Sequence, residues 1–331
     1  MNKVLVIGGG GREHAIVHAL SLSSQVDKIY AAPGNAGIAH MAQCVHLKDT
    51  QVDELLEFAK KEEITLTVVG PEASLALGIV DKFTAAGLTI FGPTQAATRI
   101  ESSKEFAKEL MKKYNVPTAD YQVFDDFESA NQYIHNHTLP IVLKYDGLAA
   151  GKGVVVAETM EQAELALEDM LLDKKFGKGR VVIEEFLTGP EFSFMCFVSD
   201  ENVYPMVVAQ DHKRAYDGDC GPNTGGMGAY SPLPFISQND IDWSLENIMK
   251  PMAKALVAEG TPFRGVLYGG LMKTNNGIKV IEFNARFGDP ETEVVLPRLK
   301  SEIFPIFMNI AKGIPCDEIV WDKRAAIGIV L

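Results

Sequence analysis

Residues 282–291 are Glu-Phe-Asn-Ala-Arg-Phe-Gly-Asp-Pro-Glu, and the run Lys279-Val280-Ile281 precedes them. In a strand, side chains two residues apart share a face, so Glu282, Asn284 and Arg286 are predicted to line up. A carboxylate beside an amide oxygen suits Mg²⁺, which takes oxygen ligands and keeps substrate phosphates as its remaining partners. A guanidinium beside them could clamp an anion with two parallel hydrogen bonds. The alternative is a polar edge strand that ends in a Gly-Asp-Pro turn, and these residues alone leave it open.

A second stretch, residues 141–156, favours a site. Residues 141–144 are predicted as a strand that ends in Lys144, residues 146–152 as a loop of small residues, and residues 153–156 as the returning strand. This hairpin excludes a P-loop, whose glycine-rich turn opens a helix. Backbone N–H groups of such a loop could still cover a triphosphate, with Lys144 and Lys152 adding positive charge. A solvated glycine hairpin is the alternative.

The first hundred residues alternate strands and helices. Strands are predicted at 3–7, 28–31, 66–69 and 88–91, and helices at 13–20, 52–61 and 75–86. This alternation predicts a doubly wound parallel sheet, and ligands collect at the carboxyl ends of such strands. Further along the chain, strands are predicted at 180–186, 191–198, 203–209, 265–272 and 278–284.

Composition restricts the classes of function. The 331 residues are 47% hydrophobic and 23% charged, which is typical of a soluble globular protein of two or three domains. A net charge of −13 argues against nucleic acid or an anionic membrane surface as a partner. No apolar run approaches the roughly 18 residues of a membrane span. The cysteines are far apart in the sequence, which favours reduced thiols and a cytoplasmic location; they are Cys44, Cys196, Cys220 and Cys316.

Motifs over nearly the whole chain resemble the ATP-grasp superfamily and, within it, the phosphoribosylamine–glycine ligases. They are Gly8 to His14, Pro33 to Gly37, Gly70 to Glu72, Lys144 to Gly153, Gln210 to Arg214, Gly221 to Tyr230, and Glu282 to Glu291. The resemblance implies a multidomain α/β and α+β fold: a parallel α/β domain over residues 1–119, a small ATP-grasp lid over 120–190 and a large ATP-grasp part over 191–331. The family continues into a β-rich domain. Because the chain ends within an apolar stretch at Leu331, we expect that domain to be missing, and with it efficient ligation.

The resemblance also implies a reaction. Glycine is joined to 5-phosphoribosylamine through glycyl phosphate, with ATP as co-substrate and Mg²⁺ or Mn²⁺ as cofactor, in purine biosynthesis. The partners are then small molecules. Carried over residue by residue, the family's nucleotide site has phosphate-binding lysines at 104, 144 and 152, a covering loop, a linker behind adenine, and a ribose acceptor. The expected ATP-binding residues are Lys104, Lys144, Gly151, Lys152, Gly153, Glu184, Glu185, Phe186, Leu187 and Glu191.

The same resemblance implies the reacting centre. Glu282 and Asn284 are the expected metal ligands, and Arg286 with Lys144 would neutralise phosphoryl charge. Asp211 and Asp289 would receive the glycine ammonium. The expected substrate-binding residues are Gly10, Gly11, Arg12, Glu13, Asn35, Glu72, Lys213, Asn223 and Thr224. The N–H groups at the helix start near Gly10 favour an anion. Glu72 is either an acceptor for ribose hydroxyls or an acid that complements a helix dipole.

The main rival is a dinucleotide-dependent oxidoreductase, suggested by the glycines after the first strand. In the Gly-x-Gly-x-x-Gly register that begins at Gly8, Glu13 stands where the third glycine belongs. The second strand also ends without an acid for a ribose hydroxyl. An ATP-binding regulatory module, a biotin-dependent carboxylase and a peptide ligase are further alternatives, and the motifs at 33–37, 70–72, 221–230 and 282–286 argue against them.

Overall fold

The computed structural model describes residues 1–147, 153–177, 179–218 and 220–331. The chain divides into two compact units. Unit 1 comprises Met1–Thr98, Phe192–Gly269 and Asn284–Leu331, and unit 2 comprises Arg99–Glu191 and Gly270–Phe283. Within these described ranges, every helix is too short or too polar to cross a membrane. The boundaries predicted at residues 119 and 190 stay predictions.

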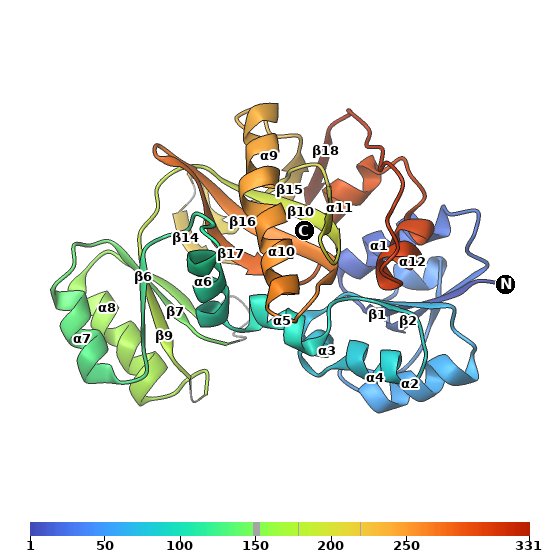
Figure 1. The fold of residues 1–331 in the computed structure, drawn as a ribbon, viewed down its shortest axis with the longest axis horizontal. Coiled ribbons are helices and arrows are strands. Elements are labelled where there is room, and N and C mark those ends of the chain that lie inside the picture. The colour runs from blue at the N-terminus through green and yellow to red at the C-terminus, as the bar shows by residue number, and fades with distance from the viewer. Residues whose placement is uncertain (148–152, 178, 219) are drawn as a thin grey trace. The chain divides into compact units, whose positions relative to one another are not determined.

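A five-stranded parallel sheet opens unit 1, in the order β3-β2-β1-β4-β5. Alternate side chains of β1 enter different cores: Val4 and Val6 pack with α1, whereas Leu5 and Ile7 pack with α2 and α4. Figure 1 shows α1 on one side of this sheet and α2 with α4 on the other. The doubly wound sheet is therefore confirmed. Its elements are β1 Lys3–Gly8, α1 Gly11–Ser21, β2 Lys28–Pro33, β3 Gln43–Cys44, α2 Val52–Lys61, β4 Leu66–Val69, α3 Glu72–Ala76, α4 Ile79–Ala85 and β5 Ile90–Phe91.

Two predicted elements were wrong in extent. The helix predicted over residues 75–86 is split into α3 and α4, because Gly78 between them has φ +75°, which does not continue a right-handed helix. The strand predicted over residues 203–209 is β11 Asn202–Pro205. It stops where Pro205 supplies no N–H for the ladder, and Ala209 instead pairs with Ser193 as an isolated bridge.

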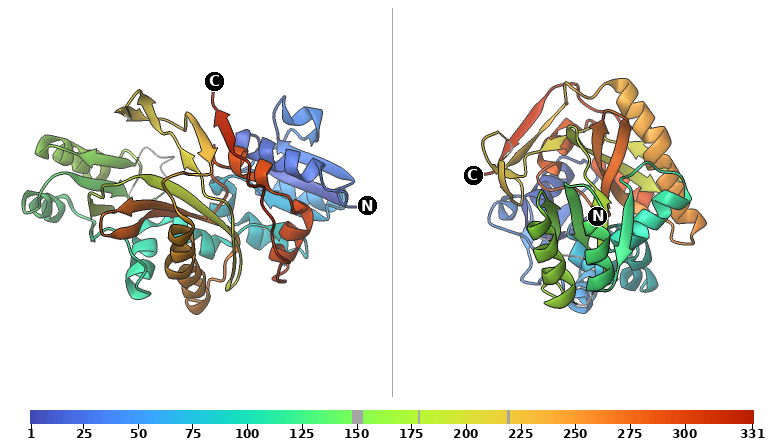
Figure 2. Two further views of the ribbon diagram at one scale, coloured as in Figure 1. Left: turned by 90° about the horizontal axis from the view of Figure 1, so that it is seen from above. Right: turned by 90° about the vertical axis from the view of Figure 1, so that its left-hand side faces the viewer.

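Unit 2 contains an antiparallel sheet in the order β6-β9-β7-β8. Helices α7 and α8 pack on one face of it, as Figure 2 shows. The predicted hairpin is confirmed, with Lys144 of β7 opposite Val154 of β8. The elements are α5 Gln95–Ser102, which begins in unit 1, α6 Lys104–Lys113, β6 Tyr121–Phe124, α7 Phe127–His135, β7 Ile141–Tyr145, β8 Val154–Ala157, α8 Met160–Leu167, a π-helical turn Glu168–Leu172 and β9 Val181–Glu185.

The remaining elements of unit 1 add three further sheets, of which the smallest is the pair β13-β14. Strand β10 lies between β11 and β16, and β15 lies between β12 and β18. Strands β16 and β17 each continue across the boundary between the units. The elements are β10 Glu191–Ser199, β12 Gln210–Asp211, β13 Arg214–Tyr216, β14 Cys220–Asn223, β15 Gly228–Ser231, α9 Gln238–Ser244, α10 Lys250–Ala258, β16 Arg264–Thr274, β17 Gly277–Asn284, α11 Thr292–Val295, α12 Ile303–Ala311 and β18 Ala326–Ile329.

Four phenylalanines join these parts of unit 1 in one core. Phe91 ends β5, Phe197 lies in β10, Phe287 follows β17 and Phe307 lies in α12. The Phe91 and Phe307 ring centroids are 4.3 Å apart, and the Phe287 centroid is 6.0 Å from that of Phe197. Such pairs stabilise by roughly 0.5–1.5 kcal/mol beyond their buried area. The residues just after β17 are therefore anchored in the core.

Candidate functional site

A buried ionic cluster in unit 2 surrounds Glu184. Its Oε1 lies 3.0 Å from Lys144 Nζ and its Oε2 lies 3.1 Å from Lys108 Nζ. The sheet register explains the first contact, because Val142 pairs with Glu184 and Lys144 is the diagonal neighbour on the same face. All three side chains are 3 or 4% exposed. A buried cluster of two ammoniums and one carboxylate has an excess positive charge that suits an anionic ligand.

Backbone acceptors hold both ammonium groups. Lys144 donates to the Ile281 carbonyl at 3.0 Å. Lys108 donates to Thr118 Oγ1 at 2.8 Å and to the Ala119 carbonyl at 3.3 Å. Burial lowers the pKa of Lys108 to about 8, while the Glu184 carboxylate opposes this shift and the Lys144 charge adds to it.

Lys104 lies where the predicted covering loop begins. It is the first residue of α6, which Ser103 caps by accepting from the Phe106 N–H at 3.2 Å. Asp146 also accepts the Glu105 N–H at 3.2 Å, and Lys104 Nζ donates to the Gly147 carbonyl at 3.3 Å. The start of the loop is therefore tied to the start of α6. The predicted residues Gly151 and Lys152 lie outside the described residues, and the Gly153 carbonyl accepts the Tyr145 N–H.

The predicted adenine linker leaves β9 toward the surface. Glu185 is exposed and pairs with Lys279 of β17, a contact that lowers the Glu185 pKa against the opposing effect of burial. Phe186 is 40% exposed, Leu187 is half-buried and Glu191 begins β10. Their roles toward adenine and ribose stay predictions.

The two predicted metal ligands lie on β17. Glu282 is half-buried and faces Gly270 of β16, where an added Cβ would lie 3.5 Å from its Cγ. Asn284 is buried, and its Oδ1 accepts from Arg286 Nη2 at 3.3 Å. Groups of three or more His, Cys, Asp or Glu side chains that could hold a metal do not occur among the described residues. Two hard oxygen donors fit an ion such as Mg²⁺, which keeps phosphates and water as its other ligands.

Arg286 follows β17 in a bend and belongs to a charged network of unit 1. Its Nε lies 3.6 Å from Glu72 Oε2, and Arg12 Nη1 lies 4.0 Å from the same oxygen. Both guanidiniums donate to the Phe287 carbonyl, each at 3.2 Å. The two arginines lower the pKa of Glu72 against the opposing effect of burial. Glu72 is also the first residue of α3, so it interacts with arginines as well as with the helix start.

The carboxylate of Glu13 binds a backbone N–H at the start of α1, where a substrate anion was predicted. Its Oε2 accepts the Gly10 N–H at 2.7 Å, and its Oε1 lies 2.6 Å from Arg12 Nε. Glu13 is 2% exposed, and a Cβ at Gly70 would lie 2.0 Å from its Oε1. The anion at this N–H group is therefore a side chain of the chain itself. The substrate role of residues 10–13 stays a prediction. The Gly10 N–H takes no part in it, because Glu13 already accepts its hydrogen bond.

Two further acids surround the same turn. At Gly10 an added Cβ would lie 3.3 Å from Asp289 Oδ2, and at Gly11 it would lie 2.4 Å from Glu293 Oε1. Burial raises the pKa of Glu293 to about 8, and the charge of Asp289 adds to the shift. Glu291 is buried and accepts from Ser193 Oγ at 2.8 Å and from the Tyr268 hydroxyl. Glu291 thereby ties the end of the Gly-Asp-Pro turn to β10 and β16.

The other predicted substrate residues are engaged in local contacts. Asn35 donates to the Gly9 carbonyl at 2.9 Å and accepts the Ile38 N–H at 2.8 Å, so it ties its loop to the turn before α1. Asp211 Oδ2 lies 3.4 Å from Lys213 Nζ. Thr224 Oγ1 donates to the Lys213 carbonyl at 2.9 Å. Asn223 ends β14, and its side chain lies outside the described part of the chain.

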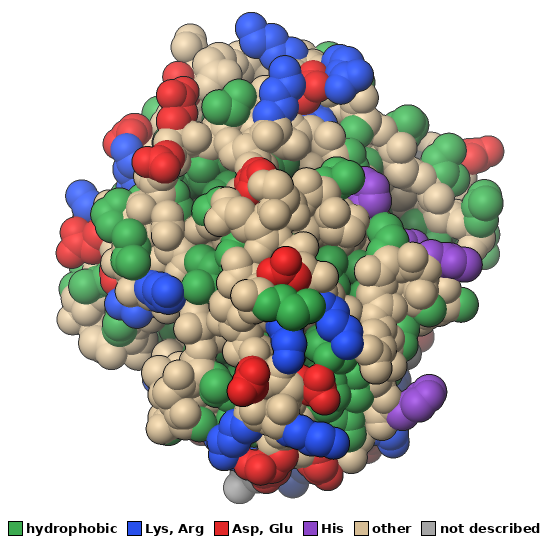
Figure 3. Space-filling model, turned by 90° about the vertical axis from the view of Figure 1, so that its right-hand side faces the viewer, with side chains coloured by type: hydrophobic (Ala, Val, Ile, Leu, Met, Phe, Trp, Pro, Cys, Tyr) green, Lys and Arg blue, Asp and Glu red, His purple; other side chains and the backbone are tan. Residues whose placement is uncertain are grey.

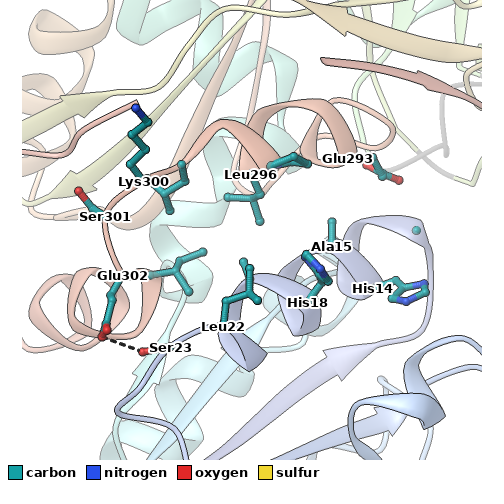
Figure 4. A pocket seen from close by; sticks show the side chains of 15 residues that line it. His14, Ala15, His18, Leu22, Ser23, Glu293, Leu296, Lys300, Ser301 and Glu302 are labelled. Atoms are coloured by element: carbon teal, nitrogen blue, oxygen red, sulfur yellow. Dashed lines mark hydrogen bonds between the residues drawn. The ribbon is translucent and has the colours of Figure 1, made fainter. Parts of the chain in front are cut away.

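A pocket of about 550 Å³ lies in unit 1 between α1 and residues 293–303. Figure 4 shows His14 and His18 of α1 facing Glu293 and Leu296 across it. Of the predicted site residues, Gly11 lines this pocket. On the face drawn in Figure 3, basic and acidic side chains of the described residues are interspersed.

Two family descriptions match consecutive parts of the chain. Residues 2–101 match the phosphoribosylglycinamide synthetase N domain, and residues 102–292 match its ATP-grasp (A) domain. The chain belongs to the phosphoribosylglycinamide synthetase family. The resemblance inferred from the motifs and the predicted fold class are therefore confirmed.

Relatives within the phosphoribosylglycinamide synthetase family cover almost all of the chain. A phosphoribosylamine–glycine ligase of Halalkalibacterium halodurans is 54% identical over 330 residues, which are 99% of this chain and 77% of the relative. One of Streptococcus pneumoniae is 53% identical over 99% of this chain and 79% of the relative. The crystal structure of the Thermotoga maritima ligase has a TM-score of 0.86 at 31% identity, covering 99% and 79% of the two chains. A biotin carboxylase domain from Hydrogenobacter thermophilus has a TM-score of 0.72 at 18% identity, which shows the fold alone.

Sequence reasoning missed three charged groups of this family member, of which Lys108 and Glu291 are buried and Glu293 is half-buried. Lys108 stands among other lysines of a polar helix, Glu291 follows a proline in the Gly-Asp-Pro turn, and Glu293 is the second residue of the short helix α11. Each resembles an ordinary surface charge in the sequence. Lys108 shares a helix face with Lys104, four residues before it, but so does the exposed Lys112, and this spacing alone does not identify the buried lysine.

Proposed function

We propose that this chain catalyses the ATP-dependent ligation of glycine to 5-phosphoribosylamine, giving glycinamide ribonucleotide, ADP and phosphate in purine biosynthesis. The observation that carries the proposal is the 54% identity, over 99% of the chain, to a relative named phosphoribosylamine–glycine ligase. The charged clusters of each unit support it, because a carboxylate is a poor electrophile and must be activated by phosphoryl transfer.

In the first step, a glycine carboxylate oxygen attacks the γ-phosphorus of ATP. The bond from that phosphorus to the β-bridging oxygen breaks, and ADP leaves. Phosphoryl transfer depends mainly on alignment and on cations near the equatorial oxygens. Lys144 and Lys104 supply such cations from β7 and from the start of α6, and Arg286 supplies one after β17.

In the second step, the ribosylamine nitrogen attacks the carbonyl carbon of glycyl phosphate. The carbon–oxygen bond to phosphate breaks, and the nitrogen loses one proton. Asp289 is our proposed acceptor for the glycine ammonium, with Asp211 as a second acid. Glu72, between Arg12 and Arg286, is the proposed acceptor for ribose hydroxyls.

Glu282 and Asn284 would hold a divalent cation. When bound, such an ion neutralises phosphate charge and orients the transferring group. We propose Mg²⁺, or Mn²⁺ in its place, because both donors are oxygens. We also propose a cytoplasmic location and no nucleic-acid partner. Free thiols at Cys44, Cys196 and Cys316 and the net charge of −13 support these two points.

The test is an ADP-release assay over a panel of amino acids, with ribose 5-phosphate and ammonia forming the amine in the reaction mixture. We expect glycine alone to increase ADP release, and glycinamide ribonucleotide to be detectable by mass spectrometry even where its yield is low. A Lys144→Met variant serves as the control for contaminating ATPase. Release of ADP with another amino acid and none with glycine would assign the chain to a different ligase. Tight binding of NADH in a fluorescence titration would favour the oxidoreductase instead.

A further inference from the structure

The ionic cluster of unit 2 assigns different tasks to its two lysines. An ammonium carries three N–H donors. Lys108 Nζ has three acceptors within reach, namely Glu184 Oε2, Thr118 Oγ1 and the Ala119 carbonyl. Lys144 Nζ has two among the described residues, Glu184 Oε1 and the Ile281 carbonyl. Lys108 therefore has an acceptor for each of its three donors, whereas Lys144 is held by fewer contacts and is the lysine that can change partner.

The two contacts to Glu184 also differ in kind. Glu184 Oε1 is buried, and its 3.0 Å ion pair with Lys144 Nζ lacks good hydrogen-bond geometry. Lys108 is held on its other side by Thr118, whose hydroxyl donates to the Val280 carbonyl at 2.7 Å. The Val280 N–H in turn donates to the Pro117 carbonyl at 2.8 Å. Lys108 is thus fixed to β17, while Lys144 is free to exchange one partner.

We propose that Lys108 is a positioning residue that remains paired with Glu184 and so allows Lys144 to exchange the Glu184 carboxylate for a nucleotide phosphate. Without a second cation, the exchange would leave a buried carboxylate unpaired, which is strongly unfavourable. With Lys108 in place, the carboxylate keeps its counter-charge throughout. This inference rests on the proposed function only in taking ATP as the ligand.

The charge state of Lys108 adds a pH dependence. The charged or titratable groups that face it are Lys144 of β7, Glu184 and Glu185 of β9, and Tyr121 of β6, whose ring centroid lies 5.5 Å away. Burial lowers the Lys108 pKa to about 8. Above that pH, Lys108 loses its proton and Lys144 becomes the sole partner of Glu184. ATP affinity should therefore fall as the pH rises through 8.

The experiment measures the Kd of Mg-ATP by isothermal titration calorimetry, without glycine or amine. We expect Lys108→Met to weaken binding by about 100-fold. Lys108→Arg, which keeps the charge, should stay within about fivefold of the parent and lack the decline near pH 8. Lys112→Met, an exposed lysine of the same helix, is the matched control and should bind like the parent.

A double variant separates positioning from a merely structural role. Adding Glu184→Gln to Lys108→Met removes the carboxylate that has lost its partner. The double variant should bind Mg-ATP at least tenfold more tightly than Lys108→Met alone. Two independent sites would not show such coupling. Should Lys108→Met fail to fold, the double variant and Lys108→Arg still carry the test. Parental affinity in Lys108→Met, or no recovery in the double variant, overturns the inference. Normal ATP binding by a parent that makes no glycinamide ribonucleotide would instead refute the proposed function alone.

Discussion

The carboxylate of Glu13 is expected to contribute more to the stability of unit 1 than any surface acid. Replacement by alanine would remove the cap on the Gly10 N–H and the ion pair to Arg12. Loss of such a helix cap costs about 0.5–2 kcal/mol. Removal of one partner from a buried ion pair costs roughly 3–5 kcal/mol, and the second carboxylate near Arg12, that of Glu72, is 4.0 Å away. We therefore expect Glu13→Ala to lower the free energy of unfolding by about 3–5 kcal/mol.

The prediction has a graded series. Glu13→Gln keeps an oxygen for the Gly10 N–H and loses only the charge, so a loss of about 1.5–3 kcal/mol is expected. Gly70→Ala tests the same contact from the other side, because its Cβ would lie 2.0 Å from Glu13 Oε1. Glu54 is the matched control, since it occupies the same position in the first turn of α2 and is exposed. Glu54→Ala should change stability by less than about 0.5 kcal/mol.

The assay is urea unfolding followed by circular dichroism, with hydrogen exchange on peptides from α1 to locate the change. Two compact units need not unfold together, so the exchange data assign the loss to unit 1. The reasoning is refuted if Glu13→Ala lowers stability no more than Glu54→Ala does. A loss confined to peptides of unit 2 would contradict it equally.

Glu282→Gln and Asn284→Leu should each reduce Mg²⁺-dependent ATP turnover at least tenfold, while thermal scans show melting within a few degrees of the parent; parental turnover at limiting Mg²⁺ would exclude the metal assignment. A lysine at position 286 cannot keep the contacts to Glu72, Asn284 and the Phe287 carbonyl together. In steady-state kinetics, Arg286→Lys should therefore lower kcat about 10- to 100-fold with little change in ATP affinity. An unchanged kcat would show that Arg286 has no catalytic role. The Glu293 pKa is raised from 4.5 to about 8 by burial, so its contribution to stability is fully present below pH 4.5 and is lost as the pH rises through 8. At pH 9, the free energy of unfolding of Glu293→Gln should therefore exceed that of the parent by about 1–2 kcal/mol, after allowance for solvent screening. Urea unfolding of both proteins at pH 5 and pH 9 measures this difference. The same pH dependence in both proteins would contradict the prediction.

The fold was predictable where the sequence has strong periodicity. Strands and helices alternate along the first hundred residues, and glycine or proline follows each of the four predicted strands within two residues, so the doubly wound sheet followed from local pattern. The hairpin at 141–156 followed in the same way. The break at Gly78 was missed because an isolated glycine is tolerated within a helical pattern. The end of β11 at Pro205 was missed because the apolar run continues past it.

The site was less predictable, because its charges are paired over long sequence distances. Lys108 and Glu184 are buried together although 76 positions (184 − 108) separate them. Nothing local distinguishes Lys108 from the exposed Lys112 on the same helix. The acid at Glu13 was correctly identified as the residue that breaks the dinucleotide fingerprint. The hydrogen bond from the Gly10 N–H to the Glu13 carboxylate was not predictable, because Gly70 leaves room for that carboxylate only in the tertiary structure.

Phe287 connects the interior of unit 1 to the arginines that surround Glu72. Its ring packs with Phe91, Phe197 and Phe307, and its carbonyl receives the guanidiniums of Arg12 and Arg286. The packing of these rings and the position of the proposed phosphate-binding Arg286 therefore depend on one peptide unit. A lineage that adapts to another temperature by repacking these rings also displaces the carbonyl that aligns two cations. Substitutions in this interior are thus expected to be inherited together with compensating changes around the arginines, and rarely one by one.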